Sequence, residues 1–353
     1  MTNKRIIDFS QSINEALKIS MLKDKNILLI GLGVNDPKGI FGTTIGLEKF
    51  FPSNRIFDMP TAENSMTGLA IGLSIAGKKP IIVHQRVEFS LLSMDQIINQ
   101  AAKWFYMSGG KQNIPLVIRL IIGRGWGQGP QHSQSLETLF SHIPGLKVVT
   151  PSDPYSAKGL LISSIEDNNP VIFFEHRWCH TLRGVVPKNY YKIPIGKSRY
   201  VTRGKHITII TFSYMVIEAI KVLKILKDNN IQAEIIDLQS LRPLDKEKFL
   251  SSAKKTKRIL VIDNGWMQYG ISSEILAIIS ENLKNKKDYK IDRVGVLDTP
   301  IPSTVALAKF CYPNQSSIIK KIEKLINKKI KIKEIYKSKF KPDQLDQDFI
   351  GPF

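Results

Sequence analysis

Glu63 follows the extended stretch 58–62 and stands at the start of a largely apolar helix that the sequence predicts over residues 64–76. A carboxylate at the N-terminus of a helix is stabilised by the helix dipole, so one interpretation of Glu63 is a structural cap. The helix favours a second interpretation, because small residues recur at every fourth position and predict close packing against another helix or subunit. These residues are Gly68, Gly72 and Ala76. An acid at such a buried seam can share a proton with a ligand, as acid–base catalysis requires.

His132 lies in the predicted loop 129–135, which reads Gly-Pro-Gln-His-Ser-Gln-Ser. Most lone histidines are structural, but a histidine in a loop between elements is accessible for proton transfer. Phe89 is a second candidate whose residue type alone indicates only a core aromatic. The sequence therefore offers Glu63 as a candidate acid and His132 as a candidate for a catalytic or substrate-contacting role.

The glycines Gly31 and Gly33 follow a predicted strand, as glycines do in dinucleotide-binding loops. The third glycine of that fingerprint would fall at position 36, where Asp36 stands, and Pro37 interrupts any following helix. The sequence also contains no Walker loop, no Gly-x-Ser-x-Gly motif and no His/Cys cluster with metal-ligand spacing. The absence of these motifs excludes a dinucleotide-binding loop, a phosphate-binding Walker loop, a serine-hydrolase elbow and a His/Cys metal site.

Short β-branched runs alternate with amphipathic stretches, which is typical of parallel sheets with crossover helices. The first set has predicted strands at 27–30, 79–83, 116–122 and 170–174, and helices at 64–76 and 95–107. The second set has strands at 206–212, 233–238 and 258–262, and helices at 215–228 and 270–283. The stretch 183–204 between the sets is rich in Pro, Lys, Tyr and Gly without a clear period. We therefore predict an α/β protein with domains at 1–185 and 205–330, a linker at 186–204 and a polar tail at 331–353.

The 353 residues suffice for two domains, and 51 Lys and Arg residues give a net charge of +20. The lysines are scattered, and no base-stacking platform or nucleic-acid motif accompanies them. We therefore predict a solvated basic surface and no nucleic-acid partner, with an acidic protein partner as the next alternative. Two distant cysteines, no signal peptide and no apolar run of membrane-spanning length indicate a cytoplasmic protein without a membrane span.

The stretch 55–77 around Glu63 resembles the cofactor-activating segment of beta subunits of the thiamin diphosphate-dependent pyruvate and branched-chain 2-oxo acid dehydrogenases. Other segments are similar to this family in order and spacing. They are residues 89–90, 95–103, 106–110, 129–135, 237–245 and 265–270. The resemblance covers residues 5–330. It implies a parallel-sheet domain that binds the pyrimidine of the cofactor, followed by a transketolase C-terminal-like α/β domain.

The resemblance implies roles for three side chains. In the family, the glutamate at the position of Glu63 hydrogen-bonds the aminopyrimidine ring of thiamin diphosphate, which promotes removal of the C2 proton of the thiazolium. The aromatic residue at the position of Phe89 stacks on the aminopyrimidine, and the histidine at the position of His132 helps to guide reductive acyl transfer. The implied reaction is oxidative decarboxylation of a 2-oxo acid with transfer of the acyl group to a lipoyl arm.

Residues 164–170 resemble a turn that binds potassium in some members of the family. Hard oxygen ligands of this kind suit such a cation, although a plain capped turn is the alternative. The implied ligands are the Asp167 carboxylate and the backbone carbonyls of Leu116, Ser164, Ile165 and Asn169.

The family holds the diphosphate and its magnesium with a Gly-Asp-Gly element followed by an asparagine, and no Gly-Asp-Gly occurs in this chain. The resemblance therefore implies an alpha subunit that carries the diphosphate and magnesium site, within a two-alpha, two-beta heterotetramer. It assigns the C-terminal domain to assembly and, in many complexes, to docking of a lipoyl acyltransferase core.

Three places depart from the family pattern. Leu32 and Gly33 replace two acidic residues, residues 83–88 (Val-His-Gln-Arg-Val-Glu) replace a strand with an acid and aromatics, and Asn264 replaces an acid. These departures indicate a paralogue that acts on an unusual 2-oxo acid or uses an acceptor other than lipoamide. Two alternatives stay open: a split transketolase-like enzyme that moves a ketol or acyl unit onto a sugar or aldehyde, and a non-catalytic scaffold subunit.

Overall fold

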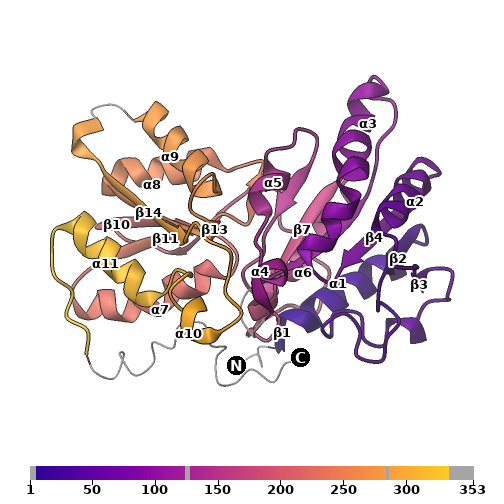
Figure 1. The fold of residues 1–353 in the computed structure, drawn as a ribbon, viewed down its shortest axis with the longest axis horizontal. Coiled ribbons are helices and arrows are strands. Elements are labelled where there is room, and N and C mark those ends of the chain that lie inside the picture. The colour runs from indigo at the N-terminus through magenta and orange to yellow at the C-terminus, as the bar shows by residue number, and fades with distance from the viewer. Residues whose placement is uncertain (1–4, 124–127, 284–285, 334–353) are drawn as a thin grey trace. The chain divides into compact units, whose positions relative to one another are not determined.

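The computed structural model of the protein describes residues 5–123, 128–283 and 286–333. These residues form two units, each with its own sheet and helices (Figure 1). The first unit comprises residues 5–123 and 139–195, and the second comprises the described residues of 128–138 and 196–333. Of the predicted tail 331–353, residues 334–353 lie outside the described part of the chain.

The first unit is built on parallel strands in the order β6-β7-β5-β4-β2-β3. The strands are β2 (Ile27–Gly31), β3 (Ile56–Asp58), β4 (Lys79–His84), β5 (Val117–Ile122), β6 (Lys147–Val149) and β7 (Val171–His176). Every residue of β2, β5 and β7 is buried, as expected where helices cover both faces of a parallel sheet. Because the strands are parallel, their carboxyl ends meet at one edge, which is where ligands bind in sheets of this kind.

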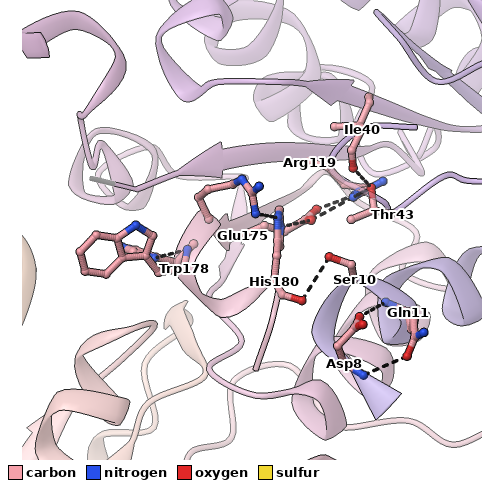
Figure 2. Close-up of polar contacts among 11 residues, drawn as sticks. Asp8, Ser10, Gln11, Ile40, Thr43, Arg119, Glu175, Trp178 and His180 are labelled. Carbon is pink, nitrogen blue, oxygen red and sulfur yellow. Dashed lines mark hydrogen bonds and ion pairs between the residues drawn. The ribbon is translucent and has the colours of Figure 1, made fainter. Parts of the chain in front are cut away.

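Helices and short helical turns connect these strands. They are α1 (Phe9–Lys23), η1 (Leu47–Lys49), α2 (Glu63–Ile75), η2 (Val87–Ser93), η3 (Gln96–Ala101), α3 (Ala102–Met107), α6 (Pro154–Ile165) and η4 (Arg177–Cys179). Helix α1 packs against α6, and α2 packs against β4, η2 and η3. A capping box between Asp8 and Gln11, drawn in Figure 2, fixes the start of α1 by satisfying two backbone amides. A short antiparallel pair joins β1 (Ile6–Asp8) to β8 (Arg183–Val185).

The second unit has the strand order β14-β13-β10-β11-β9, with β9 antiparallel to β11 and the other pairs parallel. The strands are β9 (Arg199–Thr202), β10 (Ile207–Thr211), β11 (Ala233–Asp237), β13 (Arg258–Trp266) and β14 (Lys290–Val296). Helices α7 (Met215–Asp228) and α11 (Gln315–Ile326) lie on one face of this sheet, and α8 (Lys246–Thr256) and α9 (Ile271–Asn282) lie on the other (Figure 1). The shorter elements are α4 (Gly129–His132), α5 (Glu137–Ser141), β12 (Ser240–Arg242), η5 (Lys286–Asp288) and α10 (Val305–Ala308).

The α/β class predicted from the sequence is confirmed, but one predicted helix has a different form. Instead of one α-helix over 95–107, the chain forms the π-helix η3 and then α3. Over so few residues the apolar pattern cannot distinguish a π-helix from an α-helix, because the two periods differ by less than one residue per turn. In addition, the last residues of the predicted linker form β9, which hydrogen-bonds to β11.

Candidate functional site

Glu63 is the first residue of α2, and only 6% of its surface is exposed. Glu63 is the acidic residue in the first turn of α2, where the helix dipole would stabilise its carboxylate, so the capping interpretation stays open. Among the described residues, no hydrogen bond or ion pair reaches the Glu63 carboxylate. This carboxylate is therefore available to hydrogen-bond a ligand.

Phe89 lies in η2, the helical turn that follows β4, and its ring is half-buried. The turn is held by the Ser90 hydroxyl, which donates to the Val87 carbonyl at 2.6 Å, and by the Phe89 amide, which donates to the Arg86 carbonyl at 3.3 Å. Because α2 packs directly on η2, the structure brings the elements of Glu63 and Phe89 together. That one cofactor ring meets both side chains stays a prediction.

His132 ends the short helix α4, and its side chain is half-buried. The turn before it needs glycine, because Gly129 has φ +72° and a Cβ there would lie 2.9 Å from the Ser303 hydroxyl oxygen. This segment belongs to the second unit, whereas Glu63 and Phe89 belong to the first. The role of His132 beside Glu63 and Phe89 stays a prediction.

Large apolar side chains are exposed on α2, η2 and α3 of the first unit; we call them the apolar patch. They are Leu69, Ile75, Leu91, Leu92, Phe105, Tyr106 and Met107. A Cβ on Gly68 would make only ordinary van der Waals contact with Oε1 of Gln96 at 3.4 Å, and a Cβ on Gly72 would meet nothing within 4 Å, so the predicted close packing of this face against another subunit stays a prediction. Exposed apolar surface of this kind marks a site of protein–protein contact.

A buried charge network lies beneath the loop after β2 and was not foreseen from the sequence (Figure 2). Arg119 Nε and Nη2 donate to the two carboxylate oxygens of Glu175 at 2.5 and 2.9 Å, and Nη2 also donates to the Thr43 hydroxyl at 2.8 Å. His180 Nε2 lies 3.3 Å from Glu175 Oε2. Burial opposes ionisation of Glu175, but the charge of Arg119 and the hydrogen bond with His180 lower its pKa to about 2.

A second buried acid, Glu137, was also missed by the sequence analysis. Asn264 Nδ2 donates to Glu137 Oε1 at 2.8 Å, and the neighbouring Asp263 accepts the amides of Gly265 and Ser272 at 3.1 and 2.7 Å. Burial raises the pKa of Glu137 to about 7, and the charge of Asp263 adds to this, while the Asn264 amide acts in the opposite direction. Asn264 pairs with Glu137 in either protonation state, whereas an acid at position 264 would have to share a proton with it.

The raised pKa of Glu137 predicts a pH-dependent stability. Between pH 4.5, the ordinary value, and about 7, the folded protein keeps a proton that the unfolded chain has released, so stability falls as the pH rises. We expect Glu137→Gln to remove this dependence, and its free energy of unfolding at pH 8 should exceed that of the wild type by up to about 3 kcal/mol. Urea unfolding at pH 5 and pH 8 measures this free energy, and Glu274→Gln is the control because Glu274 is exposed. Equal pH profiles for Glu137→Gln and the wild type would contradict the prediction.

The turn predicted to bind potassium is held together by protein groups. The Asp167 carboxylate forms an ion pair with Lys147 and accepts the Asn169 amide at 2.9 Å. The Leu116 carbonyl accepts the Val171 amide at 2.9 Å, and the Ser164 carbonyl accepts the Asp167 amide at 3.3 Å. Lys147 already supplies the positive charge that a potassium ion would bring, so the donor set fits this cation poorly. The Ile165 and Asn169 carbonyls are the other two implied ligands, and the potassium site as a whole stays a prediction.

Within the described part of the chain, no group of three or more His, Cys, Asp or Glu side chains is placed to hold a metal ion. The helices of that part are also too short or too polar to cross a bilayer.

Comparison with known proteins gives the class to which this chain belongs. Residues 5–179 match the family "Transketolase, pyrimidine binding domain", and residues 196–318 match "Transketolase, C-terminal domain". The solved structure "Split gene transketolase, inactive beta4 tetramer" aligns with a TM-score of 0.75 at 21% identity, over 91% of this chain and 98% of that chain. The chain is therefore a two-domain protein of the transketolase type.

Curated relatives place it more narrowly. It is 38% identical to the acetoin:2,6-dichlorophenolindophenol oxidoreductase subunit beta of Bacillus subtilis, over 89% of this chain and 96% of the relative. It is also 34% identical to the pyruvate dehydrogenase E1 component subunit beta of Rickettsia felis (90% and 98% covered) and 39% identical to that of Porphyra purpurea (90% and 96%). The chain belongs to the family of these beta subunits.

Proposed function

We propose that this chain is the beta subunit of a thiamin diphosphate-dependent 2-oxo acid dehydrogenase. The observation that carries the proposal is Glu63, a buried carboxylate at the carboxyl edge of a parallel sheet with no partner among the described residues. The names of the relatives, pyruvate dehydrogenase E1 and acetoin oxidoreductase subunits, support the same reaction class. The cofactor, when bound, supplies the electron sink for decarboxylation.

Glu63 would hydrogen-bond the aminopyrimidine of the cofactor and pass a proton to and from it, and Phe89 would stack on that ring. These roles suit a buried acid and a half-buried aromatic on two packed elements, α2 and η2. His132 would move a proton at the substrate during acyl transfer. Each role uses a group on this chain, whereas the groups that hold the diphosphate have to come from elsewhere.

An alpha subunit would supply the diphosphate and magnesium site. This chain lacks the Gly-Asp-Gly element, and its apolar patch offers a surface for such a partner. The relatives are themselves named beta subunits, which supports a partner and a two-alpha, two-beta assembly. Magnesium would be held mainly by the partner, and potassium at Asp167 would have to compete with Lys147. The same proposal places the assembled enzyme in the cytoplasm and has it dock to a lipoyl acyltransferase core.

Reconstitution with the alpha subunit tests the proposal. Calorimetry should show thiamin diphosphate and magnesium binding to the assembled complex and not to this chain alone. Product analysis should then show acyl transfer to lipoamide in preference to an aldehyde acceptor. Transfer to the aldehyde alone would favour the split transketolase-like alternative, and a complex that binds no cofactor would leave only the scaffold role.

A further inference from the structure

Residues 128–138, which we call the His132 segment, are fastened to strand β13 by a single buried side chain. Asn264 Nδ2 donates to Glu137 Oε1 at 2.8 Å and to the Ser135 hydroxyl oxygen at 3.3 Å. Both partners of the stronger of these bonds are almost fully buried. The segment and β13 belong to the second unit, so these contacts are internal to that unit.

A local irregularity in β13 sets the direction of the Asn264 side chain. The register of β13 against β14 shifts between Ile262 and Trp266, and Asn264 lies within this stretch. Asp263 holds the irregular stretch, because its carboxylate accepts the Gly265 amide at 3.1 Å. Irregularities of this kind in a strand re-aim a side chain away from the regular alternation. The contact with the His132 segment is therefore built into the backbone of the strand.

His132 lies between two points at which its segment is fixed. Before it, Gly129 has φ +72° and a Cβ there would lie 2.9 Å from the Ser303 hydroxyl oxygen, so the chain passes close to residue 303. After it, Asn264 holds Ser135. A short segment fixed at both ends restricts the side chains that it carries, which is what a proton-transfer group requires.

We propose that Asn264 is a positioning residue for His132, and that it acts through the segment it holds. This inference rests on the proposed function, in which His132 moves a proton during acyl transfer. Asn264 would act on the reaction only through His132. Its loss should therefore impair acyl transfer, whereas the decarboxylation that depends on Glu63 should continue.

An amide suits this role better than an acid, because Glu137 changes its protonation near neutral pH. Burial raises the pKa of Glu137 to about 7, and the charge of Asp263, which itself lies in the field of Arg293, acts in the same direction. An amide offers a donor to a carboxylate and an acceptor to a protonated acid, so the contact of Asn264 persists in both states. An acid at position 264 could keep the contact only while the two groups share a proton.

Hydrogen exchange of the full-length chain tests the positioning without any need for turnover. In Asn264→Ala, the backbone amides of the His132 segment should exchange at least about tenfold faster than in the wild type at the same pH, because the segment can open without breaking these hydrogen bonds. In Asn264→Asp, they should exchange as in the wild type at pH 6, where the two acids share a proton, and faster at pH 9, where the two acids repel each other. Wild-type exchange in Asn264→Ala, or in Asn264→Asp at pH 9, would overturn the proposal.

A swapped pair separates the hydrogen bond from the shape of the side chain. The variant that combines Asn264→Asp with Glu137→Gln exchanges the amide and the acid while keeping both shapes, so it should restore wild-type exchange at pH 9. Failure of the swapped pair to slow the exchange of Asn264→Asp would count against the proposal. Asn282→Asp is the matched control, because Asn282 is an exposed asparagine at the end of α9 in the same unit. Since Asn264→Asp is compared with itself at two pH values, the test stands even where Asn264→Ala does not fold.

Two assays of the assembled complex show whether this positioning serves acyl transfer. One uses lipoamide as acceptor, and the other uses 2,6-dichlorophenolindophenol, a dye that takes up the electrons without acyl transfer to lipoamide. The ratio of kcat with lipoamide to kcat with the dye should fall at least about tenfold in Asn264→Ala, and in Asn264→Asp at pH 9 but not at pH 6. Equal losses in both assays would mean a general structural effect and would overturn the proposal. A wild-type complex that is inactive in both assays would contradict the proposed function, whereas the exchange rates would still decide whether Asn264 holds the segment.

Discussion

With Glu63 replaced by glutamine, the enzyme assembled with its alpha subunit is expected to lose almost all activity, with kcat falling by about 10²–10⁴-fold. Glutamine has nearly the same shape and keeps a hydrogen bond to the ring, but it cannot gain or release a proton. The loss should therefore appear in kcat, whereas the affinity for thiamin diphosphate measured by calorimetry should change little. Steady-state turnover of a 2-oxo acid with lipoamide as acceptor provides the measurement.

The stability of the same variant separates catalysis from a structural role. Because no described residue pairs with the Glu63 carboxylate, removing its charge should leave the free energy of unfolding unchanged or raise it. Glu48→Gln is the matched control, since Glu48 is an exposed acid in η1 of the same unit. Full activity in Glu63→Gln, or a loss of stability that accounts for the loss of turnover, would contradict the assigned role.

Much of the fold was predictable because several of the central strands are short and wholly buried. The runs at 117–122 and 171–174 are apolar except for Arg119, and the structure places both inside the sheet, in β5 and β7. Helix α7 spans the predicted residues because its apolar and polar faces alternate with the helical period. By contrast, β3 and β6 have three residues each, too few for a periodic signal.

The candidate site was predictable only where the residues are local in sequence. Glu63 could be identified because the helix it begins has a characteristic pattern of small residues directly behind it. Arg119 and Glu175 lie 56 positions apart in the sequence. The register of β5 and β7 sets Arg119 beside Phe173 and Ile121 beside Glu175, so Arg119 and Glu175 are diagonal neighbours on one face of the sheet. A charged residue inside an otherwise apolar strand was the available signal, since a buried charge requires a partner.

The Arg119–Glu175 pair is where we expect the largest change in stability. Both side chains are fully buried and doubly hydrogen-bonded to each other, with Thr43 and His180 completing the network. Arg119→Met would leave the Glu175 carboxylate buried without its main counter-charge, at a cost of about 3–5 kcal/mol in the free energy of unfolding at pH 7. The carboxylate would escape part of that cost by taking up a proton, so the variant should lose less stability at pH 5.

A double-mutant cycle shows whether the cost arises from the uncompensated charge or from lost packing. The variant that combines Arg119→Met with Glu175→Gln has neither buried charge, and its new amide side chain would still offer an acceptor to His180. It should therefore recover most of the stability lost by Arg119→Met alone. Urea unfolding of the wild type, both single variants and the double variant supplies the four free energies. Additive losses would mean that the pair acts through shape and packing, and the electrostatic account of this network would then be wrong. Recovery would mean that the cost arises from the uncompensated Glu175 charge, because the double variant also lacks the hydrogen bond from Arg119 to Thr43 in the loop after β2.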